Sequence, residues 1–160
     1  MKGISLLEGK YAVTMDPYPQ QSKEFNRIHP FYENLRQKRF TTTRCRSCGW
    51  RSFPPRVICP ECLSTELEWV DLPVRGRVLV VTEEETGVPA GFDPPLIHAL
   101  IDLDGQLTYF GRVINCATGE LKEGDEVKLA VFRVEPVPVD AKKGAVILQE
   151  RVFFAFEKVK

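Results

Sequence analysis

The sequence contains two C-x-x-C pairs, Cys45/Cys48 and Cys59/Cys62, with ten residues between them. Each pair places two sulfurs on one side of a tight turn, and two such turns supply the four ligands of a tetrahedral metal site. A module of roughly 20 residues cannot bury enough apolar surface to fold alone. We therefore predict that these four cysteines bind a zinc ion, which dominates the stability of a short β-hairpin.

The predicted site is structural, because four protein sulfurs leave no open coordination position for water or substrate. Iron in a rubredoxin-type site and a redox C-x-x-C are the alternatives, and two matched pairs disfavour the redox one. The fifth cysteine, Cys116, is expected to be a small buried hydrophobe. The two histidines, His29 and His98, are distant from it in the sequence, so we predict no catalytic residue.

The composition is that of a soluble globular chain, with 43% hydrophobic and 28% charged residues among 160. The apolar runs "VLVV" and "VFFAF" are far too short to span a bilayer. No signal-peptide core follows Met1. We therefore expect a cytoplasmic protein without a membrane partner.

The chain before the cysteines predicts two short helices, over residues 20–28 and 31–39, interrupted by Pro30. Their apolar residues recur at steps of three and four and form one stripe. Such short helices are marginal alone, so this stripe must pack either on the same chain or, as we favour, on another protein. The stripe consists of Phe25, Ile28, Phe31, Tyr32 and Leu35.

The chain after the cysteines is rich in predicted strands, separated by turn sequences such as Asp104–Gly105. Five short strands without a helical period suggest a small closed barrel. The fold class is therefore mainly β, with an N-terminal helical arm (1–40), a metal ribbon (41–69) and a barrel domain (70–160). The predicted strands are 76–85, 96–104, 107–114, 125–135 and 145–158.

Charge is distributed unevenly along the chain. Residues 1–62 hold 11 Lys and Arg against 5 Asp and Glu, a net charge of +6, whereas the remainder has a net charge of −6. A basic run without acids surrounds the first cysteine pair and either attracts anions or is simply a solvated surface. The negative barrel half disfavours nucleic-acid binding, which stays the alternative function for such a barrel. The basic run comprises Arg36, Lys38, Arg39, Arg44, Arg46, Arg51 and Arg56.

The ordered set of motifs resembles the family filed as domain of unknown function 35. The motifs are C-x-x-C-G from Cys45, "FPPR" at 53–56, C-P-x-C from Cys59, "LEW" at 67–69, "GRV" at 76–78 and "GDEV" at 124–127. The resemblance covers nearly all of the chain from about residue 20. It implies a rubredoxin-like zinc ribbon joined to a five-stranded OB-fold. The second cysteine pair departs from this pattern. The first pair is followed by Gly49, whereas the second is followed by Leu63.

The resemblance further implies a non-catalytic subunit that accompanies a thiolase, or an acyl-CoA hydratase or hydroxymethylglutaryl-CoA synthase. The catalytic residues then belong to the partner chain, and a CoA thioester is the ligand of the complex. Guanidinium groups recognise phosphate well. We therefore expect Arg44, Arg46, Arg51 and Arg56 to contact either the CoA phosphates or the partner.

Overall fold

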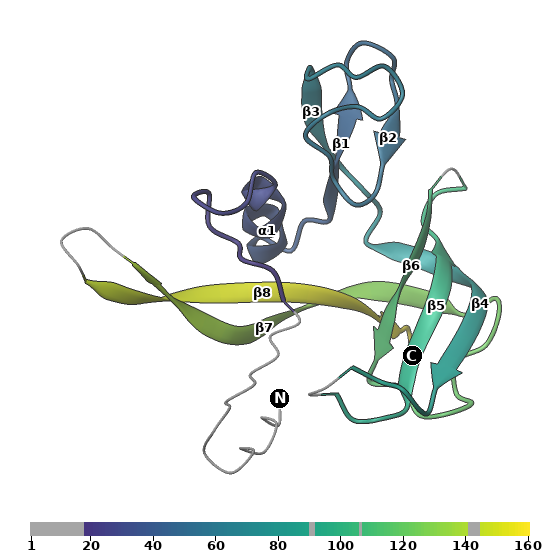
Figure 1. Ribbon diagram of the computed structural model, residues 1–160. Coiled ribbons are helices and arrows are strands. Elements are labelled where there is room, and N and C mark those ends of the chain that lie inside the picture. Colours follow the sequence, from purple (N-terminus) through teal and green to yellow (C-terminus); the bar gives the residue numbers. More distant parts are fainter. Residues whose placement is uncertain (1–17, 90–91, 106, 141–144) are drawn as a thin grey trace.

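A computed structural model describes residues 18–89, 92–105, 107–140 and 145–160. The chain runs through one short helix, a small three-stranded sheet and a barrel (Figure 1). The helix lies beside strand β8, and the small sheet stands above the barrel in this view, next to the helix. Within the described residues, no helix is long and apolar enough to cross a membrane.

The barrel is closed by five strands in the order β4-β5-β6-β8-β7, as predicted. All neighbouring strands are antiparallel except β6 and β8, which run parallel through Val113↔Phe156 and Ile114↔Glu157. This crossover places the last strand beside β6 and closes an OB-like Greek-key barrel. The strands are β4 (Arg75–Glu84), β5 (Leu96–Asp102), β6 (Thr108–Ile114), β7 (Glu126–Asp140) and β8 (Val146–Lys158).

The small sheet, which we call the ribbon, has β1 (Thr41–Cys45) between β2 (Arg51–Ser52) and β3 (Leu67–Asp71). Both pairings are antiparallel, and Cys45 pairs with Leu67 at the end of β1. The described residues therefore confirm the mainly β fold class, with a small cysteine-bearing sheet and a five-stranded barrel.

Only the second predicted helix forms, as α1 (His29–Arg36) with Pro30 in its first turn. The segment predicted as a helix over 20–28 forms turns instead. The Asn26 side chain accepts a hydrogen bond from the N–H of Ile28 and donates one to the carbonyl of Gln20. Asn side chains that bond nearby backbone in this way compete with helix formation.

The apolar stripe also packs differently from our expectation. Phe31, Tyr32 and Leu35 are buried in the core of this chain, so they do not face another protein. The stripe is buried because β8 runs under α1. Phe154 of β8 packs against Phe31, with 5.7 Å between the ring centroids. Phe25 is excluded from this contact and is 70% exposed.

Aromatic rings join the helix, the ribbon and the barrel around Phe53, which lies between the two cysteine pairs. Its ring centroid is 5.0 Å from that of Phe40, 5.1 Å from Tyr109 and 5.8 Å from Phe31. Edge-to-face and tilted aromatic pairs of this kind each contribute roughly 0.5–1.5 kcal/mol beyond their buried area. Phe53 therefore links the ribbon loop to both the helix and the barrel.

An irregularity in β7 is held by a buried arginine. The β7–β8 register shifts between Val134 and Val137, so β7 carries an extra residue. The Arg151 guanidinium, which is 1% exposed, donates two hydrogen bonds to the carbonyl of Glu135 and one to that of Tyr18. This side chain satisfies the bulged backbone and fastens the N-terminal end of the described chain to β8.

The ring of Tyr109 occupies the space that a side chain at position 111 would need, so only glycine fits there. A Cβ atom added at Gly111 would lie 2.0 Å from the Cε1 atom of Tyr109, because residues two apart on a strand share one face. We predict that Gly111→Ala lowers the free energy of unfolding by about 1–3 kcal/mol, the usual range for overpacking. Urea denaturation of the variant measures this loss.

A double-mutant cycle separates the clash from a general effect of the substitution. Adding Gly111→Ala to Tyr109→Ala should cause a much smaller further loss, because the ring is then absent. Additive effects of the two substitutions would contradict this explanation.

Candidate metal centre

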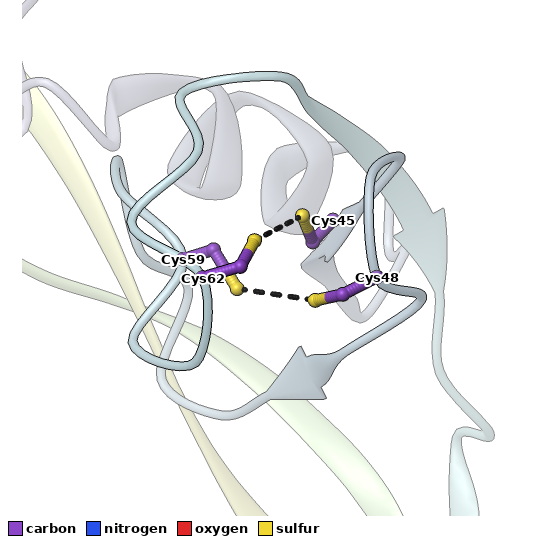
Figure 2. A group of neighbouring side chains, drawn as sticks. All are labelled: Cys45, Cys48, Cys59 and Cys62. Carbon is purple, nitrogen blue, oxygen red and sulfur yellow. Dashed lines mark hydrogen bonds between the residues drawn. The ribbon is translucent and has the colours of Figure 1, made fainter.

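The four predicted cysteines meet at one end of the ribbon. Their Sγ atoms all lie within 4.8 Å of one another, and their side chains point toward a common centre (Figure 2). The Sγ atoms of Cys45 and Cys62 are 3.6 Å apart, as are those of Cys48 and Cys59. Cys45 and Cys59 are buried, whereas Cys48 and Cys62 are exposed.

The two C-x-x-C turns have matching backbone geometry. The N–H of Gly49 donates to the carbonyl of Cys45, and the N–H of Leu63 donates to that of Cys59, at 2.9 and 3.0 Å. Both residues adopt positive φ, +77° for Gly49 and +58° for Leu63. The left-handed region costs a residue with a Cβ atom roughly 1–2 kcal/mol. Leu63 therefore occupies a glycine position, and the departure noted in the sequence does not alter the turn.

The arrangement fits tetrahedral zinc. Zn–S bonds of about 2.3 Å place tetrahedral sulfurs about 3.8 Å apart, close to the two 3.6 Å distances found here. All four positions would be filled by protein sulfur, so a bound ion supports the fold and offers no site for a substrate.

The thiols do not ionise independently. Burial opposes ionisation of Cys45, but hydrogen bonds from the backbone of Cys48 and Ser47 and from neighbouring thiols lower its pKa to about 6. The backbone at Trp50 favours the Cys48 thiolate, yet partial desolvation of its sulfur and the other three thiols raise the pKa of Cys48 to about 12. Holding all four as thiolates needs a cation, which binding of Zn²⁺ supplies.

The four arginines predicted to contact CoA or the partner lie on or beside the ribbon, where the fold brings acids to three of them. Arg44 and Arg46 both pair with Glu68, at 2.6 and 3.2 Å. The hydrogen bond from Arg44, with a further one from Arg46, lowers the pKa of Glu68. Glu68 lies after both cysteine pairs in the sequence. It comes close to the two arginines because β3 pairs with β1.

Arg51 and Arg56 differ in their surroundings. Arg51 pairs with Asp104 of the barrel at 2.7 Å, which links the ribbon to the β5–β6 turn. Arg56 is exposed and forms no ion pair with another described residue. Sequence reasoning missed the role of Asp104, because an aspartate before a glycine is first explained as a turn residue.

An open apolar pocket of about 450 Å³ lies where the helix, the ribbon loop and the barrel meet. Pro54 and Pro55 of the "FPPR" motif form part of its wall, and Arg56 follows them directly. This pocket was not predicted from the sequence, because its walls come from four segments that are distant in the sequence. Its aromatic walls are formed by Phe31, Tyr32, Phe53, Tyr109, Phe110, Phe153 and Phe154.

Cys116 lies apart from this centre, next to the barrel core. Burial, with the negative charge of Glu120, raises the pKa of its thiol, so the thiol is a poor nucleophile at neutral pH. His98 stacks on Phe110 in the barrel, with ring centroids 5.5 Å apart, and His29 begins α1.

The family model of the ChsH2 rubredoxin-like zinc ribbon domain matches residues 33–68. A DUF35 domain-containing scaffold protein of Methanothermobacter thermautotrophicus is 30% identical over 95 residues, which are 58% of this chain and 71% of the relative. The chain belongs to the DUF35 family. The predicted family and its rubredoxin-like zinc ribbon are thereby confirmed.

Two further relatives of this DUF35 chain have higher identity. A DUF35 domain-containing scaffold protein of Methanocaldococcus jannaschii is 33% identical over 93 residues, covering 56% of this chain and 64% of the relative. The benzoylsuccinyl-CoA thiolase subunit BbsA of Thauera aromatica is 35% identical over 91 residues, covering 57% and 62%. The chain thus spans slightly less than two thirds of these two relatives.

A solved structure described as an Ltp2-ChsH2(DUF35) aldolase shares the fold. Its TM-score is 0.60 at 20% identity, over 86% of this DUF35 chain and 98% of the solved chain. The whole order of helix, ribbon and barrel is therefore a known architecture.

Loss of one buried thiol should abolish metal binding by this DUF35 chain. We predict about one zinc ion per purified chain, because the four sulfurs complete one tetrahedral site. Cys59→Ser should lose the ion and unfold the ribbon, since the metal supplies its folding energy. Elemental analysis and hydrogen exchange of residues 41–71 measure both effects.

Cys116→Ser is the matched control, because it also removes one thiol but lies outside the cluster. It should retain the metal and a protected ribbon. Stoichiometric iron in the wild type, or full zinc in Cys59→Ser, would contradict the assignment.

Proposed function

We propose that this chain is a non-catalytic subunit of a heteromeric enzyme of the thiolase type, which acts on acyl-CoA thioesters. The observation that carries the proposal is its 35% identity with a benzoylsuccinyl-CoA thiolase subunit. In this role the chain supports assembly of the complex and binding of the CoA thioester, and a partner chain breaks or forms the carbon–carbon bond.

The chemistry of the cysteine residues favours a structural, non-catalytic role. The four clustered thiols form a closed donor set, which gives zinc no position for a substrate. The remaining thiol, Cys116, has a raised pKa, and nucleophilic catalysis requires an activated thiolate. These groups suit a rigid platform better than a reaction centre.

The ribbon offers features that match the two ends of an acyl-CoA. Guanidinium groups bind phosphate with charge-assisted and often paired hydrogen bonds, and Arg44, Arg46 and Arg56 are exposed. The aromatic pocket beside Pro55 suits an apolar group. Arg56 is the best phosphate ligand of the four, because it forms no ion pair with another described residue that a phosphate would have to displace.

A second candidate is a subunit of an aldolase complex. It is favoured by the likeness to the solved Ltp2-ChsH2(DUF35) aldolase chain, although 20% identity supports the shared fold alone. Single-stranded nucleic-acid binding has weaker support, since residues 63–160 have a net charge of −6 and phosphate chains are attracted by positive surfaces.

Purification of the native complex through a tag on this chain distinguishes the candidates. We expect a co-purifying catalytic chain, CoA-dependent cleavage of a β-ketoacyl-CoA by the complex, and no turnover by this chain alone. Retro-aldol cleavage without added CoA would favour the aldolase candidate. Turnover of a thioester by the isolated chain would refute a non-catalytic role.

Removing two exposed guanidinium groups should weaken acyl-CoA binding. We predict that Arg46→Ala/Arg56→Ala raises the Kd of the intact complex for an acyl-CoA by about tenfold or more, since hydrogen bonds to charged groups contribute roughly 1.5–3 kcal/mol each. Isothermal titration at two salt concentrations measures this change. Arg51 is left intact, because its ion pair with Asp104 joins the ribbon to the barrel.

Arg75→Ala is the control, because it removes an exposed, ion-paired guanidinium from the barrel. Its Kd should equal that of the wild type. Unchanged affinity and turnover in the double variant would show that the ribbon arginines do not contact CoA.

A further inference from the structure

Strands β7 and β8 continue well beyond the barrel. β6 pairs with β8 only at Val113↔Phe156 and Ile114↔Glu157, and β4 pairs with β7 only through residues 126–128. The pairs from Val134↔Arg151 to Asp140↔Val146 have no third strand in the described structure. They project away from the barrel as a two-stranded extension (Figure 1). We call residues 134–140 and 146–151 the arm.

The outer part of the arm exposes three consecutive large apolar residues, Val146, Ile147 and Leu148. Their exposed fractions are 63%, 54% and 69%. Successive strand residues point to opposite faces, so both faces of the arm are apolar here. Two-stranded hairpins are marginally stable in water without further packing, and this one leaves its apolar side chains uncovered within the described structure.

The outer edge of β8 forms hydrogen bonds with side chains near the base of the arm. The Gln21 side-chain amide both donates to the carbonyl of Val152 and accepts from its N–H. Arg36 donates to the carbonyl of Glu150. The backbone groups of residues 150 and 152 therefore point away from β7, and strand alternation points those of Leu148 and Val146 the same way. No described residue hydrogen-bonds these next two positions on that edge.

The outer edge of β7 is blocked by contrast. Pro138 lies directly opposite Leu148, so its nitrogen also faces outward, and proline has no N–H to donate. Pro136 precedes it by two residues on the same strand. Prolines at such positions protect sheet edges from strand addition. The arm thus has one protected edge and one open edge.

We propose that the open edge of β8 at Val146–Leu148 receives an extended strand from the catalytic subunit, whose apolar side chains cover the arm. This inference rests on the proposed function for the identity of the partner. Strand addition satisfies the outward N–H and C=O groups, and the flanking side chains select an apolar strand.

The short open stretch favours a catalytic subunit over a second copy of this chain. Stable interfaces bury roughly 1,200 Å² or more and involve roughly 20–30 residues on each side. A symmetric pairing of three residues with themselves falls far below that size. A subunit that also contacts the ribbon or barrel adds this strand to a larger interface.

Hydrogen exchange on the free chain and on the native complex tests the proposal. The amides of Val146 and Leu148 should exchange at least tenfold more slowly in the complex. Leu148→Pro removes the outward N–H and mimics Pro138 across the ladder, so the arm should stay paired. It should weaken the complex at least tenfold when dissociation on dilution is followed by mass photometry.

Leu148→Ala keeps the N–H and loses only side-chain contact, so it should weaken the complex less than Leu148→Pro does. Pro138→Ala changes the opposite edge, so it should weaken the complex less than threefold. Equal exchange in free chain and complex, or wild-type affinity of Leu148→Pro, overturns the proposal. A free chain that is dimeric, with these amides already protected, also overturns it in favour of a second copy. Mass spectrometry of the partner tests the proposed function separately, since an unrelated partner can still protect the edge.

Discussion

Four sulfur atoms determine whether the ribbon exists, and the attachment of the other parts depends on the ribbon. Between Thr41 and Asp71 the chain buries Cys45 and Cys59 but no large aliphatic side chain. Hydrophobic burial is the main force that stabilises ordinary domains, so this segment needs another one. A thiolate–zinc centre can supply on the order of 10–16 kcal/mol, which exceeds what these short strands contribute.

The metal centre and the aromatic core are connected through the loop between the cysteine pairs. Phe53 lies in that loop and contacts rings from the helix and the barrel. Arg51, nearby on β2, reaches Asp104 of the barrel. The geometry of the metal centre therefore sets the position of the ring that joins all three parts. The exposed arginines are held at a defined place relative to the aromatic pocket for the same reason.

The features that the sequence predicted correctly are those governed by local rules. The cysteine spacing predicted the metal cluster, and runs of β-branched and aromatic residues between turn sequences predicted all five barrel strands. The helix predicted over 20–28 failed because a single side chain, Asn26, bonds its own neighbouring backbone. Glu68 and the pocket were missed because pairing between distant segments creates them. Local patterns contain no information about which strands become neighbours.

The prolines of β7 limit how many strands can be added to this sheet when the protein assembles. A sheet that gains a strand normally presents a fresh edge, and two unprotected edges allow growth without limit, as in fibres. Here Pro138 lacks the donor that a further strand on β7 would need. Within the described arm, strand addition is therefore favoured on the side of β8. The molecule is therefore suited to form closed complexes of fixed size, although it carries a hairpin whose apolar residues would otherwise favour aggregation.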